Sequence, residues 1–457
     1  MNRSGNGYTL TSARAVAIAC GLLLGEGAAR ADKLRIENVT VAPRDARTAT
    51  VRFDIAWDKS WRDKTNHDAA WVFFKVRADD KSDWQPVRLA ADKVLNPAGY
   101  GQVEGGTPLD FIVPDGDDGF VGMFVRRAAE GKGELAARGV TAVWDFTANK
   151  GVTRDVKVRM QAFGIEMVYV AEGPFYLGSG GAELNGFYMY TDGSQHTQPY
   201  RVTSAGAIPT GRQKGRLWAR KGAQPEDNGE IPASFPNGYS AFYCMKYHIT
   251  GVQYAGFLNT LSAAQAEARY PGPETVIRSG ESPNYTYSGK DGAARGISWA
   301  DGAAFAAWAG LRPMTELEWE KAVRGPREPK PDEVGPSYWN IPFHSWFWPL
   351  LHDRDGERTV TVGNAAGRRF RGTHGLGTPV LPADCPQDDA VGAGIRSCGR
   401  TGASARLSDR RYAAGGEPER KPPSRGARTW DVYECQYAAS HPSPWRAVRT
   451  APKQVGQ

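Results

Sequence analysis

Apolar and polar residues alternate along residues 33–163 with a period of two, which is typical of β-strands. The segments with this pattern are short, and clusters of turn-forming residues such as 79–82 and 115–119 separate them. The expected strands are 34–41, 48–57, 70–76, 84–89, 109–113, 120–126, 139–146 and 153–162. Because no helical period lies between these segments, we predict an antiparallel, all-β sandwich domain over residues 32–162.

The pattern becomes helical at residues 295–325, where two short helices are expected. The first covers about 299–309, with Ser298 as its N-cap and Gly310 at its end. The second begins after Thr315, which forms a capping box with Glu318, and it stops at Gly325. A further helix is expected after Thr250, and its inner face should carry Val252, Tyr254, Phe257, Leu258 and Leu261.

Length and composition describe a loop-rich globular protein. At 457 residues the chain is long enough for two or three domains, and its 40% hydrophobic content is ample for their cores. The 54 glycines and 30 prolines favour irregular connections over long helices. A net charge of +7 is spread along the chain without a basic block, so we do not expect nucleic acid as a partner.

Residues 1–31 have the features of a signal peptide. Arg3 and Arg14 precede the apolar run 15–24, and Ala29-Arg30-Ala31 fits a cleavage site. A lipid on Cys20 is the alternative. No later stretch is apolar over the roughly 18 residues that a membrane-spanning helix needs, so we expect no transmembrane segment. We therefore expect an exported protein, periplasmic or extracellular.

Several residues permit two interpretations. The four cysteines after residue 31 could form two disulfides in three pairings or remain buried thiols; they are Cys244, Cys385, Cys398 and Cys435. The acidic segment 115–119 is either a calcium loop or a solvated turn. The tryptophan-rich segment 54–73 is either a sugar-binding platform or part of the core.

Three stretches resemble the formylglycine-generating enzyme family, also called the sulfatase-modifying factor family. The clearest is Gly-Ile-Ser-Trp at 296–299, Ala-Trp-Ala-Gly-Leu-Arg at 307–312 and Thr-Glu-Leu-Glu-Trp-Glu-Lys-Ala-Val-Arg-Gly at 315–325. Pro-Met stands at 313–314 where Leu-Pro is common. Residues 167–179 resemble the opening strand pair of the family, and 242–250 resemble a later strand. The structural residues of this signature are Trp299, Trp308, Arg312, Thr315, Glu318 and Trp319.

The resemblance implies a C-type-lectin-like α+β fold for residues 163–452, followed by a tail at 453–457. It weakens after Gly325, although 404–410 and 445–449 resemble two late strands of the family. Residues 180–235 are rich in glycine and polar residues and are expected to form a long excursion from the fold.

The resemblance also implies an activity, the oxidation of a protein cysteine to formylglycine at a copper(I) ion held by two cysteines five positions apart. Cys398 is the nearest equivalent and is the catalytic candidate, but Ala403 stands five positions beyond it. Cys385 and Cys398 are the thiol metal candidates, and Asp388 and Asp389 are candidates for calcium. The histidines do not form the clustered motif of the family's iron-dependent sulfoxide synthases.

We therefore expect that copper is not a cofactor, that calcium is a candidate, and that the oxidase activity is lost or altered. The alternative is a non-catalytic lectin-like protein that binds a protein, peptide or glycan, or that acts in the cell envelope.

Overall fold

The computed structural model describes residues 34–78, 82–94, 107–114, 120–178, 180, 187–193, 198–219, 227–247, 249–280, 283–287, 294, 296–297, 299–326, 328–329 and 447–452. Within these ranges the side chains of 91–94, 299–300, 316, 319 and 323–324 are not described. None of the helices in this part of the chain is both long and apolar enough to cross a bilayer.

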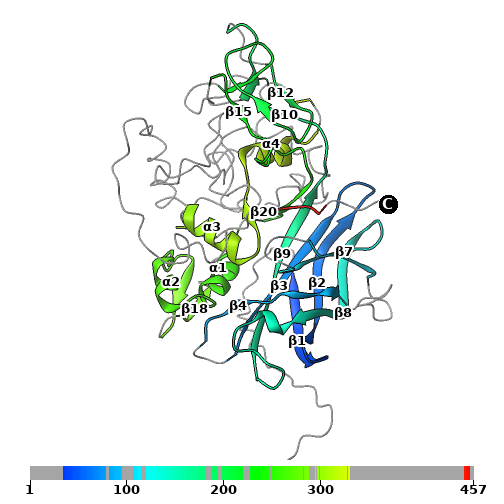
Figure 1. The fold of residues 1–457 in the computed structure, drawn as a ribbon, viewed down its shortest axis with the longest axis vertical. Helices are drawn as coiled ribbons and strands as arrows, with labels where there is room; N and C mark the ends of the chain where they lie inside the picture. The colour runs from blue at the N-terminus through cyan, green and yellow to red at the C-terminus, as the bar shows by residue number, and fades with distance from the viewer. Residues whose placement is uncertain are drawn as a thin grey trace, which may run out of the picture.

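Two antiparallel sheets form most of the structure (Figure 1). The smaller has the strand order β1-β2-β8-β5, with β1 at Arg35–Pro43, β2 at Thr48–Arg62, β8 at Gly131–Asp145 and β5 at Leu89–Val94. The larger has the order β19-β20-β16-β9-β3-β7-β6, and β4 (Gln85–Pro86) also pairs with β3. Its strands are β19 (Arg312–Pro313), β20 (Ala447–Thr450), β16 (Phe242–Met245), β9 (Arg159–Val170), β3 (Asp68–Arg77), β7 (Met123–Arg127) and β6 (Leu109–Ile112).

The two sheets share a buried apolar cluster. It contains Val51 and Phe53 from β2, Val72 and Phe74 from β3, and Val140 from β8. Alternate residues of β3 point to this cluster and to the opposite face, as the pleat of a strand requires. Of the tryptophans in 54–73, Trp57 and Trp71 are fully buried and Trp61 is nearly so, which excludes the sugar platform and supports the core interpretation.

β9 joins the first part of the chain to the second. It pairs with the whole of β3, from Arg77↔Arg159 to Asp68↔Val168, and its other edge pairs with β16. The strand expected at 153–162 therefore begins later and runs on past residue 163, where the second domain was expected to start. Val156 and Val158 alternate with polar residues as in a strand, but they lie in the loop before β9. This alternation caused the strand to be predicted from residue 153 instead of from residue 159.

Four α-helices are described: α1 (Gly251–Leu258), α2 (Ala263–Ala268), α3 (Trp299–Trp308) and α4 (Glu316–Arg324). In Figure 1, α1, α2 and α3 lie on one side of the larger sheet, and α4 lies nearer the small sheets at the top. Side chains of α1 and α3, including Phe257 and Phe305, pack with Trp71 and Phe73 of β3 in a second cluster. Val252 is 54% exposed, so its expected place on the inner face of α1 was wrong. α2 was not predicted, although Ser262 and Gln265 form its capping box.

The excursion at 180–235 contains short strands. β10 (Phe175–Leu177) pairs with β12 (Tyr200–Val202), β11 (Phe187–Met189) with β14 (Leu217–Ala219), and β13 (Ile208–Pro209) with β15 (Glu230–Ile231). These strands bury an apolar cluster of their own, which Leu317 of α4 completes. β9 and β10 thus lie in different sheets, and the expectation of a strand pair at 167–179 was wrong.

Candidate functional site

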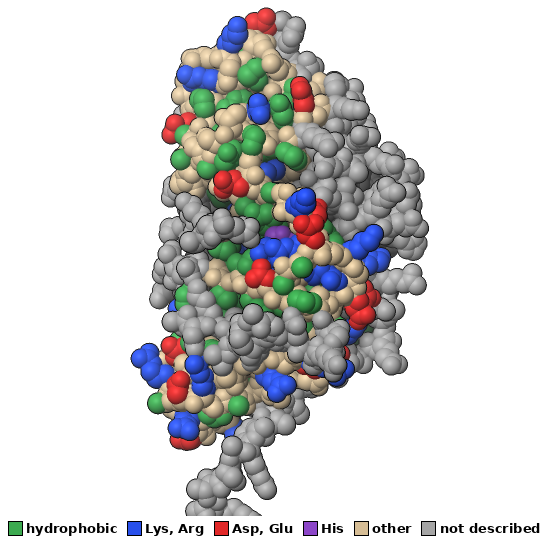
Figure 2. All heavy atoms as spheres, turned by 90° about the vertical axis from the view of Figure 1, so that its right-hand side faces the viewer, with side chains coloured by type: hydrophobic (Ala, Val, Ile, Leu, Met, Phe, Trp, Pro, Cys, Tyr) green, Lys and Arg blue, Asp and Glu red, His purple; other side chains and the backbone are tan. Residues whose placement is uncertain are grey.

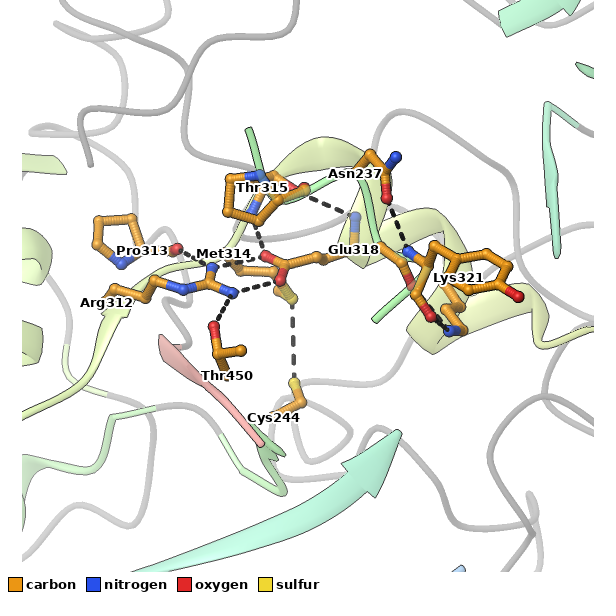
Figure 3. Close-up of polar contacts among 12 residues, drawn as sticks. Asn237, Cys244, Arg312, Pro313, Met314, Thr315, Glu318, Lys321 and Thr450 are labelled. Atoms are coloured by element: carbon orange, nitrogen blue, oxygen red, sulfur yellow. Dashed lines mark hydrogen bonds and ion pairs between the residues drawn. The ribbon is translucent and has the colours of Figure 1, made fainter. Parts of the chain in front are cut away.

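The signature residues around α4 are joined to one another (Figure 3). The Thr315 hydroxyl accepts a hydrogen bond from the Glu318 N–H at 3.1 Å, and the Glu318 carboxylate accepts one from the Thr315 N–H at 3.0 Å. The same carboxylate accepts two bonds from the Arg312 guanidinium, at 2.8 and 2.5 Å. Arg312 also donates to the Thr450 hydroxyl at 3.1 Å. One carboxylate therefore caps α4 and, through Arg312, fastens it to β19 and β20.

The next polar residues of the signature also have partners within the protein. Lys321 donates to the carbonyl oxygens of Gly238 and Tyr239 at 2.7 and 2.9 Å, and burial lowers the pKa of Lys321 to about 8. Glu320 accepts a hydrogen bond from the Gly178 N–H at 3.1 Å. In the described part of the chain, the signature therefore builds a scaffold around α4.

Residues from β3 and β20 hold the C-terminal end of α3. Trp71 Nε1 donates to the Ala309 carbonyl at 2.7 Å, and Lys75 Nζ donates to the Trp308 carbonyl at 2.6 Å. Arg449 donates to the Gly310 carbonyl. A helix C-terminus carries partial negative charge and carbonyls without helical partners, so two basic side chains and an indole N–H stabilise it there.

Burial lowers the pKa of Lys75 to about 7. Because this value is below the unfolded value of 10.5, the unfolded chain binds the proton more tightly, and stability must rise with pH between about 7 and 10. We expect the free energy of unfolding to increase as the pH is raised from 7 to 9.5, with Lys75 contributing at most about 1.4 kcal/mol per pH unit. Lys321 acts in the same direction above its pKa of about 8.

Urea denaturation at several pH values measures this dependence. The Lys75→Met variant should show a smaller increase than the unmodified protein, whatever its stability at pH 7. Equal slopes for the two proteins would contradict a lowered pKa for Lys75 in the folded protein.

A buried cluster of charged residues lies where β2, β3, β9 and β16 meet. Lys246 Nζ lies 3.5 Å from Asp68 Oδ2 and 3.4 Å from Glu166 Oε2, and all three side chains are at most 5% exposed. Asp68 also accepts bonds from Trp57 Nε1, Ser60 Oγ and the Trp61 N–H at 2.9–3.1 Å.

The local shape of β2 aims these three donors at Asp68. The register with β8 shifts between Trp57 and Ser60, and Lys59 has a φ of 53° there. Such a β-bulge turns neighbouring groups toward one point. Burial raises the pKa of Asp68, while the Lys246 ammonium and the donors from β2 oppose that rise. Since Lys246 belongs to the family-like segment 242–250, this cluster ties that segment to the N-terminal strands.

A second polar cluster surrounds His67. Its Nε2 lies 3.1 Å from an Arg126 guanidinium nitrogen and 3.0 Å from the Tyr243 hydroxyl, and the Tyr169 ring stacks on the imidazole at 4.7 Å. Asp110 accepts a hydrogen bond from Arg126 Nε at 2.8 Å and forms an ion pair with Arg126 Nη2 at 2.6 Å. In Figure 2 a histidine side chain is visible at mid-height among Lys and Arg side chains.

The protonation of His67 follows from these neighbours. A guanidinium can only donate, so Nε2 must be the unprotonated, accepting nitrogen. Burial, followed by the charges of Arg126 and Arg62, lowers the pKa of His67 to about 2. His67 is therefore neutral across the physiological pH range. It is suited to act as a fixed hydrogen-bond acceptor and not to transfer protons.

Several predicted site residues fall outside the described residues. They are Cys398, Cys385, Asp388, Asp389 and Cys435, together with Ser298 and the acidic segment 115–119. Trp299 and Trp319 lie in α3 and α4, but their side chains are not described. Trp308 is buried and donates from Nε1 to the Thr260 hydroxyl at 2.7 Å. In the part of the chain that the structure covers, no three His, Cys, Asp or Glu residues are grouped as a metal site.

The donors in the described residues do not fit the family's copper site. Cys244 is the one cysteine in this part of the chain, and its Sγ lies 4.0 Å from Met314 Sδ inside an apolar cluster with Phe242 and Val448. A thiolate pair is the donor set that the resemblance implies, and Cys244 has a thioether beside it instead.

The sequence did not indicate the buried ionisable residues in and next to β3. His67 and Asp68 precede the apolar run of this strand, and Lys75 lies near its end. Ionisable residues inside a fully buried strand are the signal that was present, because such side chains are rarely buried without partners.

The comparison with protein families supports the resemblance. Residues 154–360 match the model of the sulfatase-modifying factor enzyme 1-like domain, and the match begins just before β9. No curated protein matches the chain. The matched segment contains α1 to α4 and the capped, arginine-linked signature described above. Over residues 154–360, the chain therefore carries a domain that belongs to the sulfatase-modifying factor family.

Proposed function

We propose that the chain is an exported protein whose sulfatase-modifying-factor-like domain does not produce formylglycine through a two-cysteine copper site. The observation that carries this proposal is the pair Cys398 and Ala403, because the resemblance places the second copper ligand at residue 403. A single thiolate does not provide the two soft ligands that hold copper(I) in this family. Residues 1–31 support export through their basic start, apolar run and Ala29-Arg30-Ala31.

The alternative within this proposal is a binding protein. Arg312, Thr315 and Glu318 hold α4 through internal hydrogen bonds, so the family scaffold persists although the expected metal ligand at residue 403 is an alanine. A family scaffold that lacks the pair of copper-binding cysteines is still suited to presenting loops to a protein, peptide or glycan. This proposal includes a C-type-lectin-like fold for the matched domain and a β-sandwich for the preceding strands.

Incubation with a cysteine-containing sulfatase peptide tests the loss of activity. The purified protein, beginning at Asp32 and supplied with copper(I) and oxygen, should leave the peptide cysteine unchanged by mass spectrometry. The expected difference from an active family member is the complete absence of the aldehyde product.

Formation of formylglycine, abolished by Cys398→Ser, would overturn the proposal and identify Cys398 as the catalytic residue. The Cys244→Ser variant is the matched control. Because Cys244 is enclosed in an apolar cluster, its substitution should not change the product.

A further inference from the structure

The loop that leads into β9 is held firmly at its base. Asn149 follows η1 (Phe146–Ala148), accepts a hydrogen bond from Trp144 Nε1 at 2.8 Å and donates to the Pro86 carbonyl at 3.0 Å. Gln85 makes two bonds to the backbone of Lys150, at 2.9 and 2.8 Å. Val152 is buried in the core between the two sheets. The remaining loop residues are therefore presented in a defined place beside β4, at the lower end of the molecule in Figure 1.

The loop presents basic side chains around an apolar one. Lys150, Arg154 and Lys157 are exposed, and Val156 between them is 37% exposed. Asp155 is the only acidic residue at 149–158, so the loop carries 3 − 1 = +2. Val156 is one of three large apolar side chains that are exposed in the described residues, with Val252 and Ile277, and it stands between Arg154 and Lys157.

A cation and an aromatic ring lie near the base of this loop. Arg77 lies over the Trp84 ring, with 4.8 Å from the guanidinium carbon to the ring centroid, and both side chains are half-buried. Trp84 precedes Gln85, which bonds to Lys150, and Gly151 lies close to the Ala78 side chain. The lipid-facing patch, as we define it, consists of Trp84, Lys150, Arg154, Val156 and Lys157.

We propose that the lipid-facing patch binds the surface of an anionic phospholipid bilayer. Cations attract acidic headgroups, an apolar side chain enters the boundary between headgroups and acyl chains, and tryptophan favours that boundary. A soluble acidic partner would use the same charges but would not require Val156. With a small net charge and one apolar side chain, the contact should be reversible and sensitive to salt.

Sedimentation with vesicles tests this proposal. The full chain should bind vesicles made of equal parts phosphatidylglycerol and phosphatidylcholine, and should not bind vesicles of phosphatidylcholine alone. The double variant Arg154→Glu/Lys157→Glu should lose at least about 30-fold in affinity, since each basic residue near the surface contributes roughly a factor of five. Val156→Ser, which leaves the charge unchanged, should lose about threefold.

The matched control is Lys132→Glu/Arg138→Glu, which changes the same charge at exposed positions of β8. This control should keep its affinity for the mixed vesicles. An equal loss in the control would overturn the proposal, because net charge alone would then explain binding. Equal binding to both kinds of vesicle would also overturn the proposal. So would a result in which Val156→Ser binds vesicles as well as the unmodified protein while the protein binds polyglutamate through Arg154 and Lys157, because the loop would then recognise a soluble acidic chain. All three exchanged residues of the loop are exposed, and far-ultraviolet circular dichroism checks that each variant is folded.

Discussion

Replacing Lys246 by methionine is expected to lower the free energy of unfolding by about 3–5 kcal/mol, which is the usual cost of removing one partner from a buried ion pair. Lys246 lies between Asp68 and Glu166, and the variant would leave two carboxylates in the interior without their ammonium. Urea denaturation at neutral pH measures the change. The cost should fall as the pH is lowered, because protonation of the carboxylates removes their buried charge.

Glu134→Gln is the control for this experiment. Glu134 and Arg35 are exposed and 4.0 Å apart, so this substitution should change stability by less than about 1 kcal/mol. Combining Lys246→Met with Asp68→Asn should cost less than the sum of the two single substitutions, since the residues share one cluster. Strict additivity, or a cost for Lys246→Met as small as that of Glu134→Gln, would show that the cluster does not act as described.

Gly178→Ala is expected to destabilise the protein by at least about 3 kcal/mol, through backbone strain and a steric clash together. Gly178 has a φ of +81°, and an added Cβ would overlap the carbonyl oxygen of Phe187. Because the obstacle is backbone, no side-chain rotation relieves the overlap. The Gly178 N–H also donates to Glu320, so any shift weakens the contact between β10 and α4. Thermal or urea denaturation measures the loss.

Gly215→Ala separates the two causes. Gly215 has a similar φ of +87°, but a Cβ there would have nothing within 4 Å. It should therefore cost only the roughly 1–2 kcal/mol of the left-handed conformation. If both alanine variants lost the same stability, the steric part of the explanation would be wrong.

The sequence predicted those features whose causes are local. The capping box of α4 depends on Thr315 and Glu318, which are three residues apart. Gly310, with a φ of +71°, follows the end of α3. The segment 445–449 resembled the closing strand of the family, and β20 lies at Ala447–Thr450. The capping box and the end of α3 can be inferred from a few neighbouring residues and their propensities, whereas β20 was expected from the resemblance to the family.

Features that depend on distant partners were not predictable. Val252 has the spacing of a core residue, but its surroundings leave it exposed. The Asp68 cluster brings together residues of β2, β3 and β9 with Lys246, which follows β16, and no pattern in a single segment reveals such a meeting. The late start of β9 also depends on its pairing with β3 over residues 159–168.

The position of β20 sets the time at which the protein can finish folding. Cys244 of β16 pairs with Val448 of β20, and Pro313 of β19 pairs with Ala447. A ribosome adds only about 5–20 residues each second, so residues 242–245 wait on the order of ten seconds or more for the strand that covers their edge. During that interval the edge of β16 that β20 will cover is open, and β19 lacks the strand with which it pairs in the described residues. A nascent chain with an open strand edge is prone to pair with other chains, so chaperone binding to this chain should persist until the last residues have been made.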